Sequence, residues 1–210
     1  CGACVEVCTS GANLLQGSKL LHKKSRCNHD FACVDICRQG CREIVGESLT
    51  AEEILNVLLR DAVFYRSSGG GVTFSGGEPF AQPELLAELV SGCLWAGIST
   101  AVETCGFFRS SEVREIIEGI DEIFIDLKHM DDASHRELTG VPNGSILENI
   151  VELNRMKKKM TIRIPLIARL NDSDDNMQSV AEWCNKLPNP YSLELIPYHD
   201  LGTGKYKALG

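Results

Sequence analysis

The chain has 210 residues, a formal net charge of −8 and a composition that is 43% hydrophobic and 24% charged. That length can bury one sizeable hydrophobic core and carry a small additional module, and the balance of apolar and charged residues excludes a disordered chain. The acidic charge argues against nucleic acid as a partner. No apolar run is long enough to cross a bilayer, so we expect no membrane partner either.

The first segment of the chain is rich in cysteine. Seven of the ten cysteines lie within the first 41 residues, ahead of a long pattern of alternating strands and helices. Disulfide frameworks are typical of small secreted domains, whereas this arrangement favours metal ligation in a reducing compartment. If the metal is part of an oxygen-sensitive iron–sulfur cluster, we expect that compartment to be the cytoplasm. Because the chain starts at Cys1 rather than at a methionine, we also expect a further segment upstream.

Cys1, Cys4 and Cys8 form a C-x₂-C-x₃-C run. This is the end of the C-x₂-C-x₂-C-x₃-C pattern that holds iron–sulfur clusters, in which one loop wraps several thiolates around a cluster and the fourth cysteine reaches a neighbouring cluster. The first cysteine of the pattern would then lie upstream of Cys1.

A second run follows as Cys27-x₅-Cys33-x₃-Cys37, with Asp30 at the place of its second cysteine. If the fourth cysteines cross over, one cluster takes an upstream cysteine with Cys1, Cys4 and Cys37, and the other takes Cys8, Cys27, Cys33 and either Asp30 or Cys41. A carboxylate is a harder ligand than a thiolate, so Asp30 would make the second cluster labile or unusual in potential. A structural zinc site is the alternative, but the paired C-x₃-C tails favour two [4Fe–4S] clusters.

From residue 48 onward, apolar segments of strand and helix character alternate. Thr50 and Glu53 form a capping box that opens an amphipathic helix reaching about Tyr65. The later elements are expected as strands at 72–75, 99–103, 122–128, 160–166 and 192–197 and as helices at 83–96, 111–117, 133–138, 145–158 and 174–187. Strands joined by helical crossovers predict an α/β fold with a parallel sheet, too short for an eight-stranded barrel. We therefore divide the chain into an iron–sulfur domain, residues 1–47, and a partial barrel, residues 48–210.

Polar residues gather where the predicted strands end. Gly76, Gly77 and Glu78 follow the first of these strands, where glycine allows close backbone approach and a carboxylate can accept hydrogen bonds from a cationic group. The loop matches neither the phosphate loop nor the dinucleotide motif. The later strand ends carry Glu103, Thr104, Asp126, Lys128, Arg163 and His199. Any one of these could be a structural ion pair, but their succession indicates a shared ligand site, because the carboxyl ends of parallel strands form one rim.

The motifs in their order resemble one family. The double cysteine run, SGGGVTFSGGEP, AVETCGF, IDLKHMD, HRELTGVPN, IRIPLI and ELIPYHDLGTGKY are similar, over essentially the whole chain, to glycyl-radical-enzyme activating enzymes. These are radical S-adenosylmethionine proteins, here of the type that is like pyruvate formate-lyase activating enzyme but carries a ferredoxin-like insert. The resemblance implies a partial (β/α)₆ barrel lacking its first strand, with S-adenosylmethionine bound at the rim.

The resemblance also implies an activity and partners. S-Adenosylmethionine would be cleaved to a 5′-deoxyadenosyl radical that takes a hydrogen from a glycine of a partner glycyl radical enzyme. An electron donor such as flavodoxin or ferredoxin would supply the reducing electron. The motifs do not specify which glycyl radical enzyme is the partner.

Individual roles follow from the resemblance. Gly76, Gly77 and Glu78 match the motif that holds the methionyl amino group. The methionyl carboxylate, the ribose and, in relatives, a monovalent cation are expected near Glu103, Thr104, Asp126, Lys128, Arg163 and His199. The charges suit this arrangement, because a carboxylate needs cationic partners and an ammonium group needs acidic ones.

One motif of the family is absent from the printed sequence. The C-x₃-C-x₂-C run, whose thiolates bind the cluster that cleaves S-adenosylmethionine, precedes the ferredoxin-like insert in the family. We therefore expect a third [4Fe–4S] cluster in an upstream segment, no catalytic residue in this chain, and no activity of the chain alone. Cys105 lies where relatives often have serine, and we assign it no role.

Two other hypotheses remain at this point. The chain could be an electron-transfer iron–sulfur protein with an inert barrel, or a radical S-adenosylmethionine enzyme that acts on a small molecule. The run of motifs from Glu103 to His199 favours the activating enzyme over both.

Overall fold

The computed structural model describes residues 1–44, 46–200 and 202–204, which form two compact units, Cys1–Ser48 and Leu49–Gly204. Each unit is described by itself. In the described ranges, no helix is both long enough and apolar enough to cross a membrane.

The cysteine-rich unit consists of short elements. These are α1 (Ala3–Glu6), β1 (Asn13–Gln16), β2 (Lys19–His22), the 3₁₀ turn η1 (Lys24–Arg26) and α2 (Ala32–Asp35). Strands β1 and β2 pair antiparallel across the two-residue turn Gly17-Ser18, with Gln16 opposite Lys19. This hairpin was not predicted from the sequence, although a Gly-Ser pair between two leucine pairs is a known hairpin signal.

Asn13 is the main polar link of this unit. It is buried, and its side-chain amide donates to the Cys4 carbonyl at 3.1 Å. Its Oδ1 accepts from His22 Nδ1 at 2.8 Å and from Arg42 at 2.9 Å. Among the described residues of the unit, Cys4 and Ala12 are the only buried apolar side chains. The unit therefore has almost no hydrophobic core of its own.

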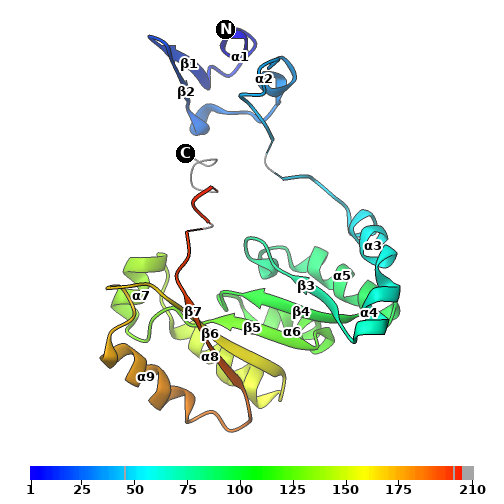
Figure 1. Cartoon of the computed structure of the whole chain (residues 1–210), viewed down its shortest axis with the longest axis vertical. Helices are drawn as coiled ribbons and strands as arrows, with labels where there is room; N and C mark the ends of the chain where they lie inside the picture. Colours follow the sequence, from blue (N-terminus) through cyan, green and yellow to red (C-terminus); the bar gives the residue numbers. More distant parts are fainter. Residues whose placement is uncertain (45, 201, 205–210) are drawn as a thin grey trace. The chain divides into compact units, whose positions relative to one another are not determined.

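The second unit is a parallel α/β structure (Figure 1). Its strands are β3 (Gly71–Phe74), β4 (Ser99–Thr104), β5 (Glu122–Asp126), β6 (Lys159–Leu166) and β7 (Ser192–Pro197), and they pair in this order, all parallel. The helices are α3 (Ala51–Arg60), α4 (Ala62–Ser68), α5 (Pro83–Trp95), α6 (Ser110–Gly119), α7 (Asp132–Thr139), α8 (Gly144–Arg155) and α9 (Asp174–Cys184), with the 3₁₀ turn η2 (Pro79–Ala81) after β3. The predicted α/β class, parallel sheet and strand positions are confirmed.

The entry into this unit was predicted as one helix but forms two. Thr50 caps α3 with the expected box, because Glu53 N donates to Thr50 Oγ1 at 3.2 Å and Thr50 N donates to Glu53 Oε2 at 2.8 Å. The chain then turns at Asp61, whose φ and ψ of −97° and 5° are not helical, and α4 begins at Ala62. Two short helices thus replace the single one expected to Tyr65.

The two faces of the sheet differ in character. Along β4, β5 and β6 the residues on one face are buried against the helices, with Val102, Ile125 and Ile162 fully buried. The alternate residues on the other face are partly exposed and include Glu103, Phe124, Asp126 and Arg163. Because side chains alternate along a strand, a single register places the core on one face and the charged residues on the other.

Candidate cofactor site

Glu78 is held in a fixed position after β3. Its Oε1 accepts from the Thr104 hydroxyl at 2.8 Å and from Phe80 N at 3.2 Å, while its Oε2 accepts from Cys105 N at 2.8 Å. Thr104 and Cys105 lie at the end of β4, so this carboxylate joins the carboxyl ends of two neighbouring strands. An ionised carboxylate has about four acceptor positions, so at least one remains for a cationic ligand.

The glycines before Glu78 leave open space. Gly76 has φ +126°, a conformation that side-chain-bearing residues rarely adopt, and an added Cβ on Gly76 or Gly77 would meet no atom within 4 Å. A side chain at either position would therefore project into open space. This arrangement fits a ligand that approaches the backbone closely.

Glu103 and Arg163 form an ion pair on the same face of the sheet. Arg163 Nη1 lies 2.8 Å from Glu103 Oε1, and Ser75 Oγ donates to Glu103 Oε2 at 2.9 Å. The hydrogen bond from Arg163 lowers the pKa of Glu103. Arg163 also lies over the ring of Phe124, at 5.5 Å from its centroid. Its buried Nε makes no hydrogen bond in the part of the chain that the structure describes, and the Glu194 carboxylate lies 3.8 Å from it.

Asp126 and Lys128 form another ion pair, at the end of β5. Their charged atoms are 3.9 Å apart. Burial raises the pKa of Asp126, against the opposing effect of the charges on Lys128 and Arg163. Register places Asp126 directly beside Arg163 on β6. A carboxylate with a raised pKa next to cationic groups is typical of functional sites.

The structure thus brings together most of the predicted rim residues. Ser75 was not among the predicted site residues, because it looked like part of the glycine loop, and Cys105 was assigned no role. Burial raises the pKa of the Cys105 thiol, and its contact with Glu78 adds to the shift. His199 follows β7 and is exposed. No hydrogen bond or ion pair joins it to the other predicted residues within the described ranges.

Four buried asparagines hold the loops that follow the strands, and sequence reasoning missed all of them. Asn149 donates to the carbonyls of Gly106 and Phe108 at 2.8 and 2.9 Å. Asn171 donates to the carbonyls of Lys128 and Pro165 at 2.8 and 2.6 Å, which links the ends of β5 and β6. The other two are Asn143 and Asn176, which bind the backbone of the loop after β5. A buried asparagine must satisfy its amide, so these side chains fix the backbone that carries the site.

A cavity lies at the opposite ends of the strands. It has a volume of about 310 Å³ and is lined by residues that include Gly69–Thr73, Ser99–Ala101, Asp121, Glu122 and Lys159. Lys159 and Glu122 pair there at 2.7 Å. None of the predicted site residues lines this cavity. The predicted site residues and the cavity therefore lie at two different ends of the sheet.

The cysteines of the first unit are at least partly accessible thiols, except for the buried Cys4. Cys8 has a lowered pKa, chiefly because of a hydrogen bond with Ser10. Although burial opposes the effect, the backbone N–H groups of Cys41, Arg42 and Gln39 lower the pKa of Cys37. No group of three or more His, Cys, Asp or Glu within the described ranges is arranged around a single metal ion. The donors themselves suit a cluster, since soft thiolates with backbone N–H groups at the sulfur are its usual ligands.

Comparisons with known proteins agree with the motifs. Residues 25–180 match the sequence model of the Radical SAM superfamily. The chain is 40% identical to choline trimethylamine-lyase activating enzyme of Oleidesulfovibrio alaskensis, over 100% of this chain and 70% of that protein. It is 39% identical to 4-hydroxyphenylacetate decarboxylase activating enzyme of Clostridioides difficile, over 86% of this chain and 57% of that protein.

Solved structures show the same fold. A crystal structure of a domain of pyruvate-formate lyase-activating enzyme from Bacteroides vulgatus matches with a TM-score of 0.59 and 39% identity, over 62% of this chain and 82% of that one. Streptococcus suis SuiB bound to S-adenosylmethionine matches with a TM-score of 0.59 at 17% identity, over 76% of this chain and 37% of that one, which shows the fold alone. The similarity to activating enzymes confirms the resemblance and favours the first of the three hypotheses. The chain belongs to the radical SAM superfamily, whose cofactors are S-adenosylmethionine and a [4Fe–4S] cluster, and within it to the activating enzymes of glycyl radical enzymes.

Proposed function

We propose that the strand ends of the second unit bind S-adenosylmethionine, with Glu78 as the acceptor for the methionyl ammonium group. The observation that carries this proposal is the fixed carboxylate of Glu78, which two backbone N–H groups and the Thr104 hydroxyl hold in place. A carboxylate held in place before the ligand arrives loses little conformational freedom on binding. The open space at Gly76 and Gly77 would admit the methionyl backbone.

The cationic residues would take the carboxylate end of the ligand. The Nε–H of Arg163 makes no hydrogen bond among the described residues, with the Glu194 carboxylate 3.8 Å away, and Lys128 lies beside Asp126 at the end of β5. Glu103, Asp126 and His199 are then left for the ribose and for a monovalent cation. Thr104 is 4% exposed and its hydroxyl already contacts Glu78, so its part would be to hold that carboxylate.

The predicted iron–sulfur domain, residues 1–47, would carry two [4Fe–4S] clusters. Their ligands would be Cys1, Cys4, Cys8, Cys27, Cys33, Cys37 and either Asp30 or Cys41. A flavodoxin or ferredoxin would deliver electrons to the clusters in the cytoplasm. The helices α1 and α2 contact one another, and Thr9, next to Cys8, lies 3.4 Å from Asp30 in the second run. This contact supports the crossing of Cys8 to the cluster of Cys27 and Cys33.

The protein substrate would be a glycyl radical enzyme. When bound, S-adenosylmethionine supplies by reductive cleavage the 5′-deoxyadenosyl radical that takes a hydrogen from a glycine of the partner. The residues of this chain would hold the methionyl group still and pair its charges. The choline trimethylamine-lyase named for a 40% identical relative is the first partner to test.

The direct test of the cofactor site is the affinity for S-adenosylmethionine, measured by calorimetry on the anaerobically reconstituted chain. Glu78→Gln keeps the shape of the side chain and removes the charge, so we expect at least about a tenfold loss of affinity. Glu122→Gln is the matched control, because Glu122 begins β5 at the other end of the sheet and lines the separate cavity. We expect its affinity to stay within about twofold of the parent chain.

The result decides between the two ends of the sheet. Equal affinity of the Glu78→Gln variant and the parent chain, with an unchanged melting temperature, would contradict the proposal. A selective loss in the Glu122→Gln variant would place the ligand in the cavity instead.

A further inference from the structure

Helix α8 makes a buried contact with the loop that follows β4. Its residues Ile146 and Asn149 are both buried and lie three positions apart, so they share one face of the helix. The Asn149 side-chain amide donates to the Gly106 carbonyl at 2.8 Å and to the Phe108 carbonyl at 2.9 Å. Because both acceptors are carbonyl oxygens, only the NH₂ group of the amide can make these bonds. Asn149 therefore ties two points of the loop to one helix.

The first of these points, Gly106, lies beside two of the donors that hold Glu78. Gly106 N donates to Thr104 Oγ1 at 3.0 Å, and that hydroxyl donates to Glu78 Oε1 at 2.8 Å. The amide of Cys105, between them in the chain, donates to Glu78 Oε2 at 2.8 Å. Gly106 has φ +76°, and a Cβ on it would lie 2.8 Å from the Ile125 side chain. The turn that presents these two donors is therefore packed tightly against β5.

The second point, Phe108, leads to the third donor of Glu78. The Phe108 ring packs against the ring of Phe80, with 4.4 Å between the ring centroids. Phe80 is buried, and its backbone N–H donates to Glu78 Oε1 at 3.2 Å. Aromatic contact of this kind adds to burial in fixing the position of both residues. Both hydrogen bonds of Asn149 thus lead, through separate residues, to the same carboxylate.

This arrangement makes the carboxylate sensitive to one distant side chain. Without the Asn149 amide, the Gly106 and Phe108 carbonyls would lose a buried donor, and the loop would have to shift to reach water or another group. The three donors of Glu78 would shift with it. A carboxylate that is no longer fixed in advance loses more conformational freedom when a ligand binds, and this lowers the affinity.

We propose that Asn149 is a positioning residue for the ammonium end of S-adenosylmethionine. It acts through the loop 104–108 and Phe80, whose groups hold Glu78. This inference rests on the proposed function, in which Glu78 accepts from the methionyl ammonium group. Its consequence is selective. Loss of Asn149 weakens the binding of ligands that carry this ammonium group and leaves the binding of the adenosyl part unchanged.

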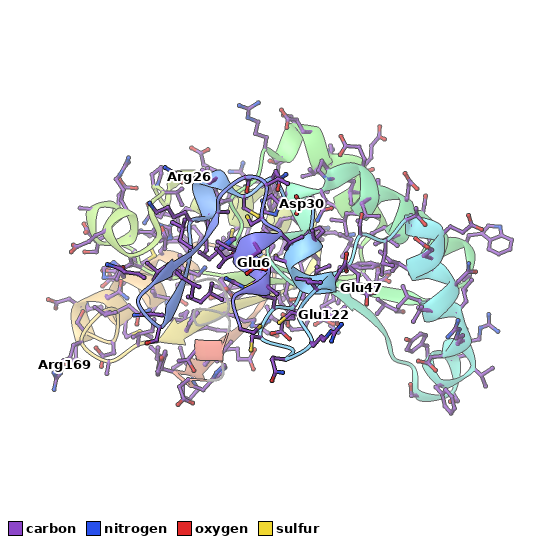
Figure 2. The ribbon with its side chains drawn as sticks, turned by 90° about the horizontal axis from the view of Figure 1, so that it is seen from above. Glu6, Arg26, Asp30, Glu47, Glu122 and Arg169 are labelled. Carbon is purple, nitrogen blue, oxygen red and sulfur yellow. The ribbon has the colours of Figure 1, made fainter. Side chains whose placement is uncertain are left out.

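The matched control is a buried asparagine on the same helix. Asn154 makes three hydrogen bonds with Asn189, in the loop before β7 at the opposite ends of the strands. A surface residue would be a poor control, because its removal leaves no buried group without a partner. Arg169 is such a residue: it is labelled in Figure 2 and points outward from the loop after β6. Asn149→Ala and Asn154→Ala should lower the melting temperature to a similar extent.

The binding test compares three ligands by calorimetry on the anaerobically reconstituted chain, at a temperature at which the variants are folded. S-Adenosylmethionine and its decarboxylated form carry the ammonium group, whereas 5′-methylthioadenosine lacks it. We expect Asn149→Ala to bind the first two about tenfold more weakly than the parent chain does, and the third within about twofold. Asn154→Ala should bind all three within about twofold. An equal loss for all three ligands in Asn149→Ala, or no loss for any, would overturn the proposal.

A double variant shows whether Asn149 acts through Glu78. Glu78→Gln has already lost the charge, so adding Asn149→Ala should weaken S-adenosylmethionine binding by no more than about twofold further. A further tenfold loss would show that the two residues act independently, which contradicts the positioning role. Failure of the proposed function has a different signature, because Glu78→Gln would then bind as tightly as the parent chain.

Hydrogen exchange resolved to single amides tests the positioning without any ligand. We expect the amides of Phe80 and Cys105 to exchange at least about tenfold faster in Asn149→Ala than in the parent chain, and at the parent rate in Asn154→Ala. Phe108→Leu keeps both hydrogen bonds of Asn149 and removes only the ring contact, so it should speed exchange of the Phe80 amide alone, and it serves as the test if Asn149→Ala does not fold. Unchanged exchange of both amides in a folded Asn149→Ala variant would overturn the proposal, as would any other pattern in Phe108→Leu.

Discussion

The two units of this protein are stabilised in different ways. The sheet unit has a continuous core in which Val102, Ile125 and Ile162 are fully buried, whereas only Cys4 and Ala12 are buried apolar residues in the described part of the cysteine unit. The cysteines of the two units also differ in burial. Cys93 and Cys184 are buried in helices of the sheet unit, and burial raises the pKa of Cys184 to about 11.

This difference shows how each unit can be stabilised. Burial of apolar area can stabilise the sheet unit without a ligand, and its two buried thiols serve as small packing residues. A segment as small as the cysteine unit cannot bury enough apolar area for the same purpose, so we expect bound metal to supply most of its stability. Cys93 and Cys184 are almost completely buried, as packing residues are.

Removal of iron should have the largest effect and should affect one unit only. After oxidation and chelation of the clusters, we expect the amides of α1, β1, β2 and α2 to exchange with solvent nearly freely, because little else holds them. The amides of β4, β5 and β6 should keep their protection. Hydrogen exchange followed by mass spectrometry measures both at once. Loss of protection in both units together would show that they do not fold independently.

Truncation in the core should have a smaller effect, confined to the sheet unit. Ile162→Ala removes a fully buried side chain from β6, and we expect a loss of about 3 to 4 kcal/mol in the free energy of unfolding. Leu193→Ala is the matched control, since Leu193 pairs with Ile162 in register but is 46% exposed on the edge strand β7. The Leu193→Ala variant should lose about 1 kcal/mol in the free energy of unfolding. Equal losses in the two variants, measured by urea unfolding, would contradict the burial pattern.

The sequence predicted the sheet unit well because its signals are local and periodic. Alternating apolar residues at Val102, Ile123, Ile125 and Ile162 identify strands with one buried face, and the Thr50 capping box marks a helix start without further context. The break at Asp61 was missed, since the apolar pattern continues across it. The hairpin of β1 and β2 was missed because its strands have only four residues each.

The residues of the candidate cofactor site could be predicted only in part, because some residue types give a signal in the sequence and others do not. Carboxylates and cations after strands stand out in a sequence, so Glu78, Glu103 and Arg163 could be found. The buried Asn149 and Asn171 could not, because an isolated asparagine in a sequence does not reveal which carbonyls it will meet. Gly106 was missed likewise, although an added Cβ there would lie 2.8 Å from Ile125.

The smallest effect should come from the support of Glu78. Thr104→Val keeps the size of the side chain but removes the hydroxyl that donates to Glu78 and accepts from Gly106 N. We expect the affinity for S-adenosylmethionine to fall about five- to tenfold, because the carboxylate loses one of its donors. Thr104→Ser, which keeps the hydroxyl, should bind within about twofold of the parent chain. If both variants bind equally well, the hydroxyl does not hold the carboxylate for the ligand.

The central claim is that the carboxyl ends of the strands, and not the cavity at their other ends, bind S-adenosylmethionine. The most direct measurement is hydrogen exchange of the reconstituted chain with and without this ligand. The account predicts slower exchange at residues 75–80 and 103–106 and unchanged exchange at residues 69–71 and 119–122. Protection of residues 69–71 and 119–122 alone, or protection of neither end at a saturating ligand concentration, would contradict it.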